Sequence, residues 1–261
     1  SGRWSDFGLR LASAAVLGPV ALYCVWYGGE AWRVFLLVAA AGLASEWSRL
    51  AHLSRQDPGQ HLILMGLIVG VAACQPHFAI GFIVLGLTFA VVLYFYGWFA
   101  AFGIPYAGVG AIALLWIRLR PQYGFDDTMF LITVVWGTDI GAYLTGRLLR
   151  GPKLAPLISP GKTWSGAVGG LLIGGFAAAM LAGGANGIAW RALPAAFLLS
   201  IFAQAGDLLE SAIKRKLGVK DSGRTIPGHG GLFDRLDGFL AASPIAALLV
   251  LSVHGGLPLW G

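Results

Sequence analysis

Long apolar runs dominate this sequence and constrain its fold more than any other feature. Of the 261 residues, 57% are hydrophobic and only 11% are charged, whereas a soluble domain carries about 25% charged residues. Nine runs are candidate membrane spans: about 7–27, 31–50, 61–74, 79–95, 97–117, 125–149, 163–182, 188–216 and 232–253. None alternates as barrel strands do, so we expect an all-α, polytopic integral membrane protein with about nine transmembrane helices.

The distribution of basic residues predicts the orientation of these helices. With the N-terminus inside, fourteen of the eighteen Lys and Arg residues lie on the cytoplasmic side, and Arg33, Arg118, Arg120 and Arg191 lie outside. This excess favours a multi-pass protein of a bacterial inner (plasma) membrane with its polar loops in the cytoplasm. No linker is evident, so residues 1–261 are expected to form a single membrane domain.

One stretch, residues 211–237, departs abruptly from the apolar composition. It holds six basic residues and three acids among many glycines. Cations bind phosphate oxygens, and carboxylates hold Mg²⁺ while leaving it open to a substrate phosphate. The stretch therefore suggests phosphoryl or nucleotidyl transfer on a polyanion. The alternative is a cytoplasmic loop that is basic only because of its orientation. The net charge of +6 is attributed to such loops facing anionic lipid, and no nucleic-acid partner is expected.

Acidic residues inside apolar runs are costly in a membrane and usually functional. Asp139 lies well inside the sixth run, and Asp207 and Glu210 lie near the end of the eighth. On a helix, Asp207, Glu210, Ser211 and Lys214 share one face that leads into the basic stretch. For Glu210, a purely structural pair with Lys214 is an equally open interpretation. Two further acids, Asp234 and Asp237, would sit three residues apart at the start of the last helix, where anions are favoured.

The residues from Ser211 to Asp237 resemble the signature of the CDP-diacylglycerol synthase (phosphatidate cytidylyltransferase) family. The matching positions are Ser-x-x-Lys-Arg from Ser211, Lys220-Asp221, and the His-Gly-Gly and Asp-Arg-Leu-Asp segments that end at Asp237. Two outlying segments also fit: Asp139 to Arg147, and Ser159-Pro-Gly-Lys-Thr-Trp164. The resemblance covers about residues 136–244, which are therefore expected to carry the active site.

The resemblance implies a membrane enzyme of phospholipid biosynthesis. It would convert CTP and phosphatidate to CDP-diacylglycerol and pyrophosphate with Mg²⁺ as cofactor. CTP, phosphatidate and membrane lipid are the implied partners, and a homodimer is a further option. Metal ligands are expected at Asp207, Asp234 and Asp237; catalytic residues at Lys220, Asp221, His229 and Arg235; and substrate-binding residues at Asp139, Tyr143, Lys162, Ser211, Lys214 and Arg215.

Two other functions remain open from the residues themselves. An ion-coupled transporter would use intramembrane acids and glycine-broken helices to form a midplane site, but no inverted repeat is visible. A CDP-alcohol phosphotransferase-like lipid enzyme would need a denser array of aspartates than Asp234-Arg-Leu-Asp-Gly238 supplies.

Overall fold

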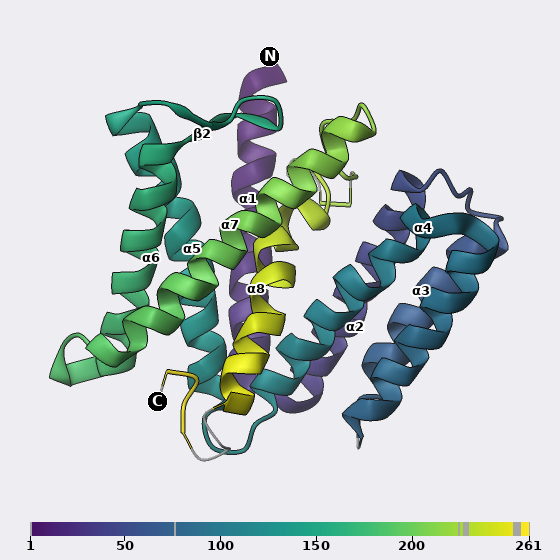
Figure 1. The fold of residues 1–261 in the computed structure, drawn as a ribbon, viewed down its shortest axis with the longest axis horizontal. Helices are drawn as coiled ribbons and strands as arrows, with labels where there is room; N and C mark the ends of the chain where they lie inside the picture. The colour runs from purple at the N-terminus through teal and green to yellow at the C-terminus, as the bar shows by residue number, and fades with distance from the viewer. Residues whose placement is uncertain (1, 76, 224, 227–229, 253–256, 261) are drawn as a thin grey trace. The chain divides into compact units, whose positions relative to one another are not determined.

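The fold is known from a computed structural model, which describes residues 2–75, 77–223, 225–226, 230–252 and 257–260, with side chains from residue 15 onward. Helices account for most of it (Figure 1). The α-helices are α1 (Gly2–Tyr27), α2 (Gly29–Leu50), α3 (Pro58–Ala72), α4 (Phe78–Arg118), α5 (Gly124–Leu149), α6 (Trp164–Gly183), α7 (Leu193–Lys216) and α8 (Phe233–Ser252). Two short strands, β1 (Lys153–Ala155) and β2 (Ser159–Thr163), and two 3₁₀ turns complete the described elements.

The chain divides into two compact units. The first comprises Ser1–Leu115 and Leu217–Leu236, and the second comprises Trp116–Lys216 and Asp237–Gly261. The first unit therefore contains the four N-terminal helices and most of the polar stretch. The second contains α5 to α7, the two strands and most of α8.

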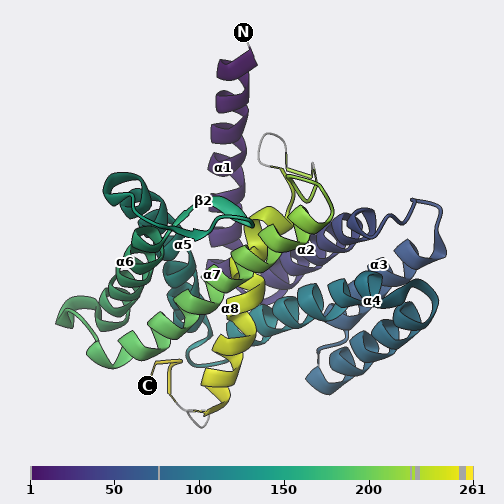
Figure 2. The ribbon, with the colours of Figure 1, turned by 45° about the horizontal axis from the view of Figure 1, so that its top comes forward.

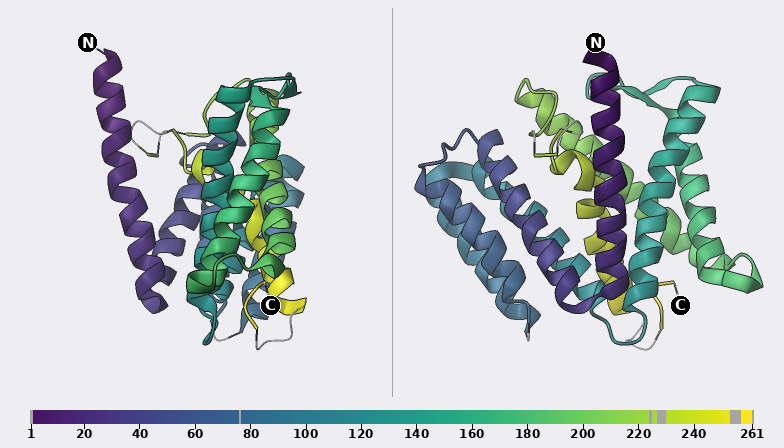
Figure 3. Two further views of the ribbon diagram at one scale, coloured as in Figure 1. Left: turned by 90° about the vertical axis from the view of Figure 1, so that its left-hand side faces the viewer. Right: turned by 180° about the vertical axis from the view of Figure 1, so that it is seen from behind.

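Within the first unit, α1 and α2 diverge from a turn at Gly28 and form a V, which both views in Figure 3 show. Helix α3 packs against the first half of α4, where a Cβ on Gly70 would lie 2.7 Å from the Leu85 side chain. The indole of Trp32 donates a hydrogen bond of 3.1 Å to the carbonyl of Leu114, which ties α2 to the second half of α4.

The expected count of nine helices is not confirmed, because two expected spans belong to one element. Residues 79–95 and 97–117 both lie in α4, which is interrupted at Gly97. Gly97 has φ 83° and ψ 174°, a conformation that only glycine adopts without steric cost. The chain changes direction there, so α4 consists of two helical arms joined at a kink (Figure 2).

Within the second unit, α5 and α6 pack unusually closely because the contact is lined by glycines. A Cβ on Gly170 would lie 2.7 Å from the Thr138 carbonyl oxygen, and one on Gly174 would lie 2.8 Å from the Thr138 nitrogen. Such small residues allow helix backbones to approach one another in a membrane protein. The Thr138 hydroxyl also donates a 2.7 Å hydrogen bond to Ser200, which connects α5 with α7.

A small antiparallel hairpin of β1 and β2, which the sequence did not predict, connects α5 to α6. Its second strand is the Ser159–Thr163 segment. Thr163 then caps α6, because its hydroxyl oxygen accepts a hydrogen bond from the backbone N–H of Gly166. Lys162 is thus held on a strand directly before a helix.

Five of the described helices are long and apolar enough to cross a membrane: those at Phe78–Arg118, Gly124–Leu149, Trp164–Asn186, Trp190–Lys216 and Phe233–Ser252. Two shorter apolar helices are found at Ala15–Tyr27 and Pro58–Ala72. The predicted helical membrane character is thereby confirmed in its coarse form.

Candidate active site

The crossing of α7 and α8 positions the central acidic residues of the second unit. A Cβ at Gly206 would lie 2.5 Å from the Asp237 carbonyl oxygen and 2.6 Å from the Ala241 side chain. On α8, a Cβ on Gly238 would lie 3.2 Å from the Val135 side chain of α5 and 3.6 Å from the Ala203 side chain of α7. Because Gly206 has no side chain, the backbone of α7 approaches the backbone of α8 at Asp237. Asp207, the residue after Gly206, is thereby brought close to Asp237.

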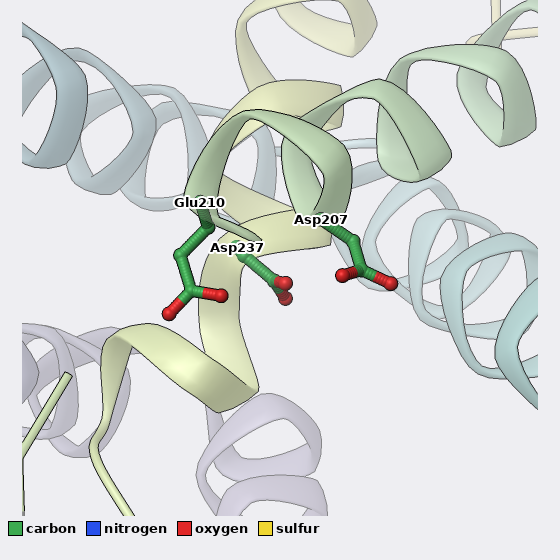
Figure 4. Close-up of side chains that lie close together, drawn as sticks. All are labelled: Asp207, Glu210 and Asp237. Atoms are coloured by element: carbon green, nitrogen blue, oxygen red, sulfur yellow. The ribbon is translucent and has the colours of Figure 1, made fainter. Parts of the chain in front are cut away.

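This crossing brings together the carboxylates of Asp207 and Glu210 on α7 and Asp237 on α8 (Figure 4). One oxygen from each lies within 4.8 Å of the others. Glu210 is only 5% exposed, and the other two are half-buried. Three carboxylates converging in this way match the oxygen ligands that Mg²⁺ prefers. We call these three residues the acidic cluster.

Two lysines neutralise part of the acidic cluster. Lys162, on β2, forms an ion pair with Asp207. Lys214, one turn after Glu210 on α7, pairs with it at 2.7 Å, as the alternative interpretation of Glu210 expected. Ser211 also donates a hydrogen bond of 3.4 Å to Asp207. The site therefore places carboxylates, which can bind a metal ion, beside ammonium groups, which can bind phosphate.

The hairpin is attached to α7 by a further contact near the cluster. The guanidinium of Arg215 donates a hydrogen bond of 3.2 Å from Nε to the carbonyl of Ile158, the residue before β2. Arg215 therefore helps to fix the strand that carries Lys162. This contact is compatible with the substrate-binding role predicted for Arg215, because its two terminal nitrogens are not used in it.

Two other predicted binding residues lie on α5. Asp139 is exposed, within electrostatic range of the Asp237 carboxylate. Tyr143 is exposed one turn further along, and its hydroxyl accepts a 2.7 Å hydrogen bond from Arg147. Their part in binding stays a prediction.

The remaining predicted residues belong to the first unit. Lys220, Asp221 and Arg235 are exposed there, and His229 lies outside the described residues. The Asp234 carboxylate accepts hydrogen bonds from Ser222 N and Oγ, each at 3.1 Å, and from Gly231 N at 2.7 Å. Among its described contacts, Asp234 thus organises its own loop, and its ligation of a metal stays a prediction.

Glu46 of α2 is a buried acid that the sequence analysis did not assign to the site. It is 0% exposed, and it accepts hydrogen bonds from Leu232 N at 2.7 Å, Phe233 N at 2.9 Å and Ser222 Oγ at 3.1 Å. A signal was present in the sequence, because Glu46 lies near the end of an apolar run, as Asp207 does.

The fold and the site together define a helical membrane protein that places clustered carboxylates against lysines. Comparison with known proteins identifies the family. The profile of the Cytidylyltransferase family matches residues 8–253, and the chain belongs to this family. The phosphatidate cytidylyltransferase of Brucella suis biovar 1 is 42% identical over 95% of this chain and 93% of its own length. The proteins of that name from Staphylococcus saprophyticus and Staphylococcus aureus are 42% and 39% identical over 59% and 66% of this chain, covering 59% and 67% of their own lengths.

Proposed function

We propose that this protein is a phosphatidate cytidylyltransferase, which forms CDP-diacylglycerol and pyrophosphate from CTP and phosphatidate. The family match and the relatives named for this activity support the proposal. The observation that carries it is the acidic cluster with Lys162 and Lys214 paired to it. In the reaction, an oxygen of the phosphatidate phosphate forms a bond to the α-phosphorus of CTP, the bond from that phosphorus to the bridging oxygen breaks, and pyrophosphate leaves.

The donor set suits a magnesium ion, with Asp207, Glu210 and Asp237 as the residues that would hold it. When bound, Mg²⁺ would neutralise negative charge that accumulates on the triphosphate during transfer. Asp234 holds its loop through its bonds to Ser222 and Gly231, and its role as a further metal ligand stays a prediction.

The two lysines and the serine that contact the acidic cluster have separate roles in this proposal. Lys162 and Lys214 each carry an ammonium group already placed beside a carboxylate, where they can also bind phosphate oxygens and orient the two substrates. Ser211 steadies Asp207. A phosphate monoester is already largely ionised near neutral pH, so the attacking phosphate needs no strong general base.

The polar stretch of the first unit supplies further phosphate-binding groups in this proposal. Lys220 and Arg235 are exposed cations suited to phosphate oxygens. Asp221 and His229 are assigned to orienting the loop or assisting proton transfer. Asp139, Tyr143 and Arg215 are assigned to binding substrate, on the strength of their match to the family pattern.

The activity is tested by incubating purified protein in detergent with phosphatidate, CTP and Mg²⁺. Pyrophosphate and CDP-diacylglycerol should appear together, and omission of either substrate should abolish both. Release of CMP, without pyrophosphate, when a CDP-alcohol and an acceptor alcohol are supplied would instead identify a CDP-alcohol phosphotransferase. Substrate-independent ion flux in liposomes, without any product, would identify a transporter.

We also propose that the chain crosses a bacterial inner membrane nine times, with its N-terminus and both polar loops in the cytoplasm. The two arms of α4 on either side of Gly97, counted separately, support nine crossings, and the distribution of basic residues supports the orientation. A homodimer stays a prediction.

Cysteine labelling in spheroplasts checks this orientation. In a variant with Cys24 and Cys74 replaced by serine, Leu157→Cys places a thiol at a fully exposed position of the hairpin turn, and Asn186→Cys places one between α6 and α7. A membrane-impermeant maleimide should label residue 186 in intact spheroplasts and residue 157 only after lysis. The opposite pattern would reverse the proposed topology.

A further inference from the structure

The buried carboxylate of Glu46 lies at the start of α8, inside the first unit. Its Oε1 accepts the backbone N–H of Leu232, and its Oε2 accepts that of Phe233. These two N–H groups precede the first hydrogen-bonded turn of α8, so they have no partner within the helix. A carboxylate from α2 therefore caps α8 across 186 to 187 residues of sequence separation, and hydrogen bonds of this charge-assisted kind are about twice as strong as neutral ones.

Ser222 connects this cap to the other end of the loop. Its hydroxyl lies 3.1 Å from Glu46 Oε2 and 3.1 Å from Asp234 Oδ2. Its backbone N–H also donates to Asp234. Ser222 thus joins a carboxylate of α2 to a carboxylate of α8. Through this contact the loop that follows α7 is held against the start of α8.

The glycines of the loop permit this close approach to Glu46. A Cβ on Gly231 would lie 1.9 Å from Ser222 Oγ and 2.7 Å from Glu46 Oε2. A Cβ on Gly223 would lie 2.9 Å from Glu46 Oε1. Real Cβ atoms do not approach other atoms so closely, so a side chain at either position would displace the Glu46 carboxylate or the Ser222 hydroxyl from its place.

The neighbouring residue, Trp47, keeps α2 in position for this contact. Its indole N–H is 3.1 Å from the carbonyl oxygens of Phe99 and Ala100 on α4. Its ring centroid lies 5.5 Å from that of Phe233, which also stacks on Tyr106 at 5.9 Å. Glu46 therefore holds the backbone of Phe233, and Trp47 contacts its side chain. The partners of Trp47 are all buried or half-buried.

We propose that Glu46 is a positioning residue for the loop that follows α7 and for the first turn of α8, and so for the phosphate-binding groups on them. The inference rests on the proposed function, because Lys220 of the loop and Arg235 of α8 are assigned there to phosphate binding. It gives α2 a role in the reaction although α2 carries none of the residues of the family signature. Glu46 acts through the loop backbone and through Ser222, and it is not assigned any contact with substrate.

The variant Glu46→Gln tests this role with little change in size. The amide must direct its NH₂ group at either the Leu232 or the Phe233 N–H, so one buried donor loses its acceptor. We expect kcat/KM for CTP to fall about a hundredfold, the scale of a small misplacement of reacting groups. Glu30→Gln is the matched control, because Glu30 lies on the same helix, is exposed and pairs only with Arg33 among its described contacts. It should leave kcat/KM unchanged.

Trypsin cleavage after Lys220 gives a second readout that a general loss of stability would not reproduce. Well below the unfolding temperature, cleavage at this bond should be several-fold faster in Glu46→Gln than in the wild type, while cleavage after Arg150 in the second unit should be unchanged. Normal kcat/KM, or unchanged cleavage after Lys220, would overturn the proposal. If Glu46→Gln does not fold, Ser222→Ala replaces it and should speed the same cleavage and lower kcat/KM about fivefold; wild-type values there would equally overturn it.

The two proposals can fail separately in this design. A wild-type protein that releases no pyrophosphate from CTP and phosphatidate would refute the proposed function. In that case the proteolysis comparison alone still decides whether Glu46 holds the loop.

Discussion

Removal of divalent cations with EDTA is expected to abolish pyrophosphate release completely, and added Mg²⁺ is expected to restore it. The reason lies in the acidic cluster, where three carboxylate oxygens lie within 4.8 Å of one another. Without a cation, the triphosphate would have to approach three carboxylates that Lys162 and Lys214, among the described residues, offset in part. The measurement is the initial rate of pyrophosphate release against free Mg²⁺ concentration.

Thermal unfolding supplies a readout of the same ion that does not depend on turnover. A ligand that binds only the folded state raises its stability, so Mg²⁺ should raise the unfolding midpoint of the wild-type protein. It should fail to do so in Asp207→Asn. Full activity in metal-free buffer, or an equal midpoint shift in Asp207→Asn, would contradict a metal site at the acidic cluster.

Replacement of the cluster aspartates by asparagine is expected to lower kcat by at least about two orders of magnitude, the scale of losing a key electrostatic group. This applies to Asp207→Asn and to Asp237→Asn individually. Asparagine keeps the size and one acceptor oxygen but removes the charge. If both residues serve one ion, the double variant should be scarcely slower than either single variant.

Asp126→Asn is the matched control for these two substitutions. Asp126 is an exposed acid in the first turn of α5 and is outside the acidic cluster, so its variant should turn over at the wild-type rate.

Asp234→Asn discriminates between the two roles considered for Asp234. As a loop residue it should affect trypsin cleavage after Lys220, and as a ligand it should raise the Mg²⁺ concentration needed for half-maximal activity. Near-normal kcat in Asp207→Asn or Asp237→Asn would remove that residue from the site.

Local patterns in the sequence predicted much of the helical architecture and one contact of the site. Helical spacing placed Glu210 and Lys214 on one face, and the structure pairs them at 2.7 Å. The close contacts of Gly170 and Gly174 with α5 likewise depend on small residues spaced along one face of α6. These features depend on residues a few positions apart, for which helix geometry is sufficient.

Contacts between distant segments could not be predicted in the same way. Lys162 and Asp207 are paired across two elements, and the α7 sequence alone gave no sign of a base for Asp207. Glu46 meets Ser222 at a separation of 176 residues. The count of nine helices is not confirmed, because hydropathy does not show whether Gly97 separates two helices or bends one. Such contacts depend on how helices are arranged in space, which hydropathy and periodicity do not specify.

The close crossing of α7 and α8 at Gly206 has a consequence for which cation the proposed metal site would accept. Selection between ions such as Mg²⁺ and Ca²⁺ depends on cavity size and on how rigidly the ligands are held. Here a Cβ on Gly206 would lie 2.5 Å from the Asp237 carbonyl oxygen, so we expect the separation of the Asp207 and Asp237 carboxylates to depend on glycine at this position. Gly206, which contributes no ligand atom, would therefore influence the ionic radius that the site accepts. A larger residue at this position would widen the site in favour of larger cations.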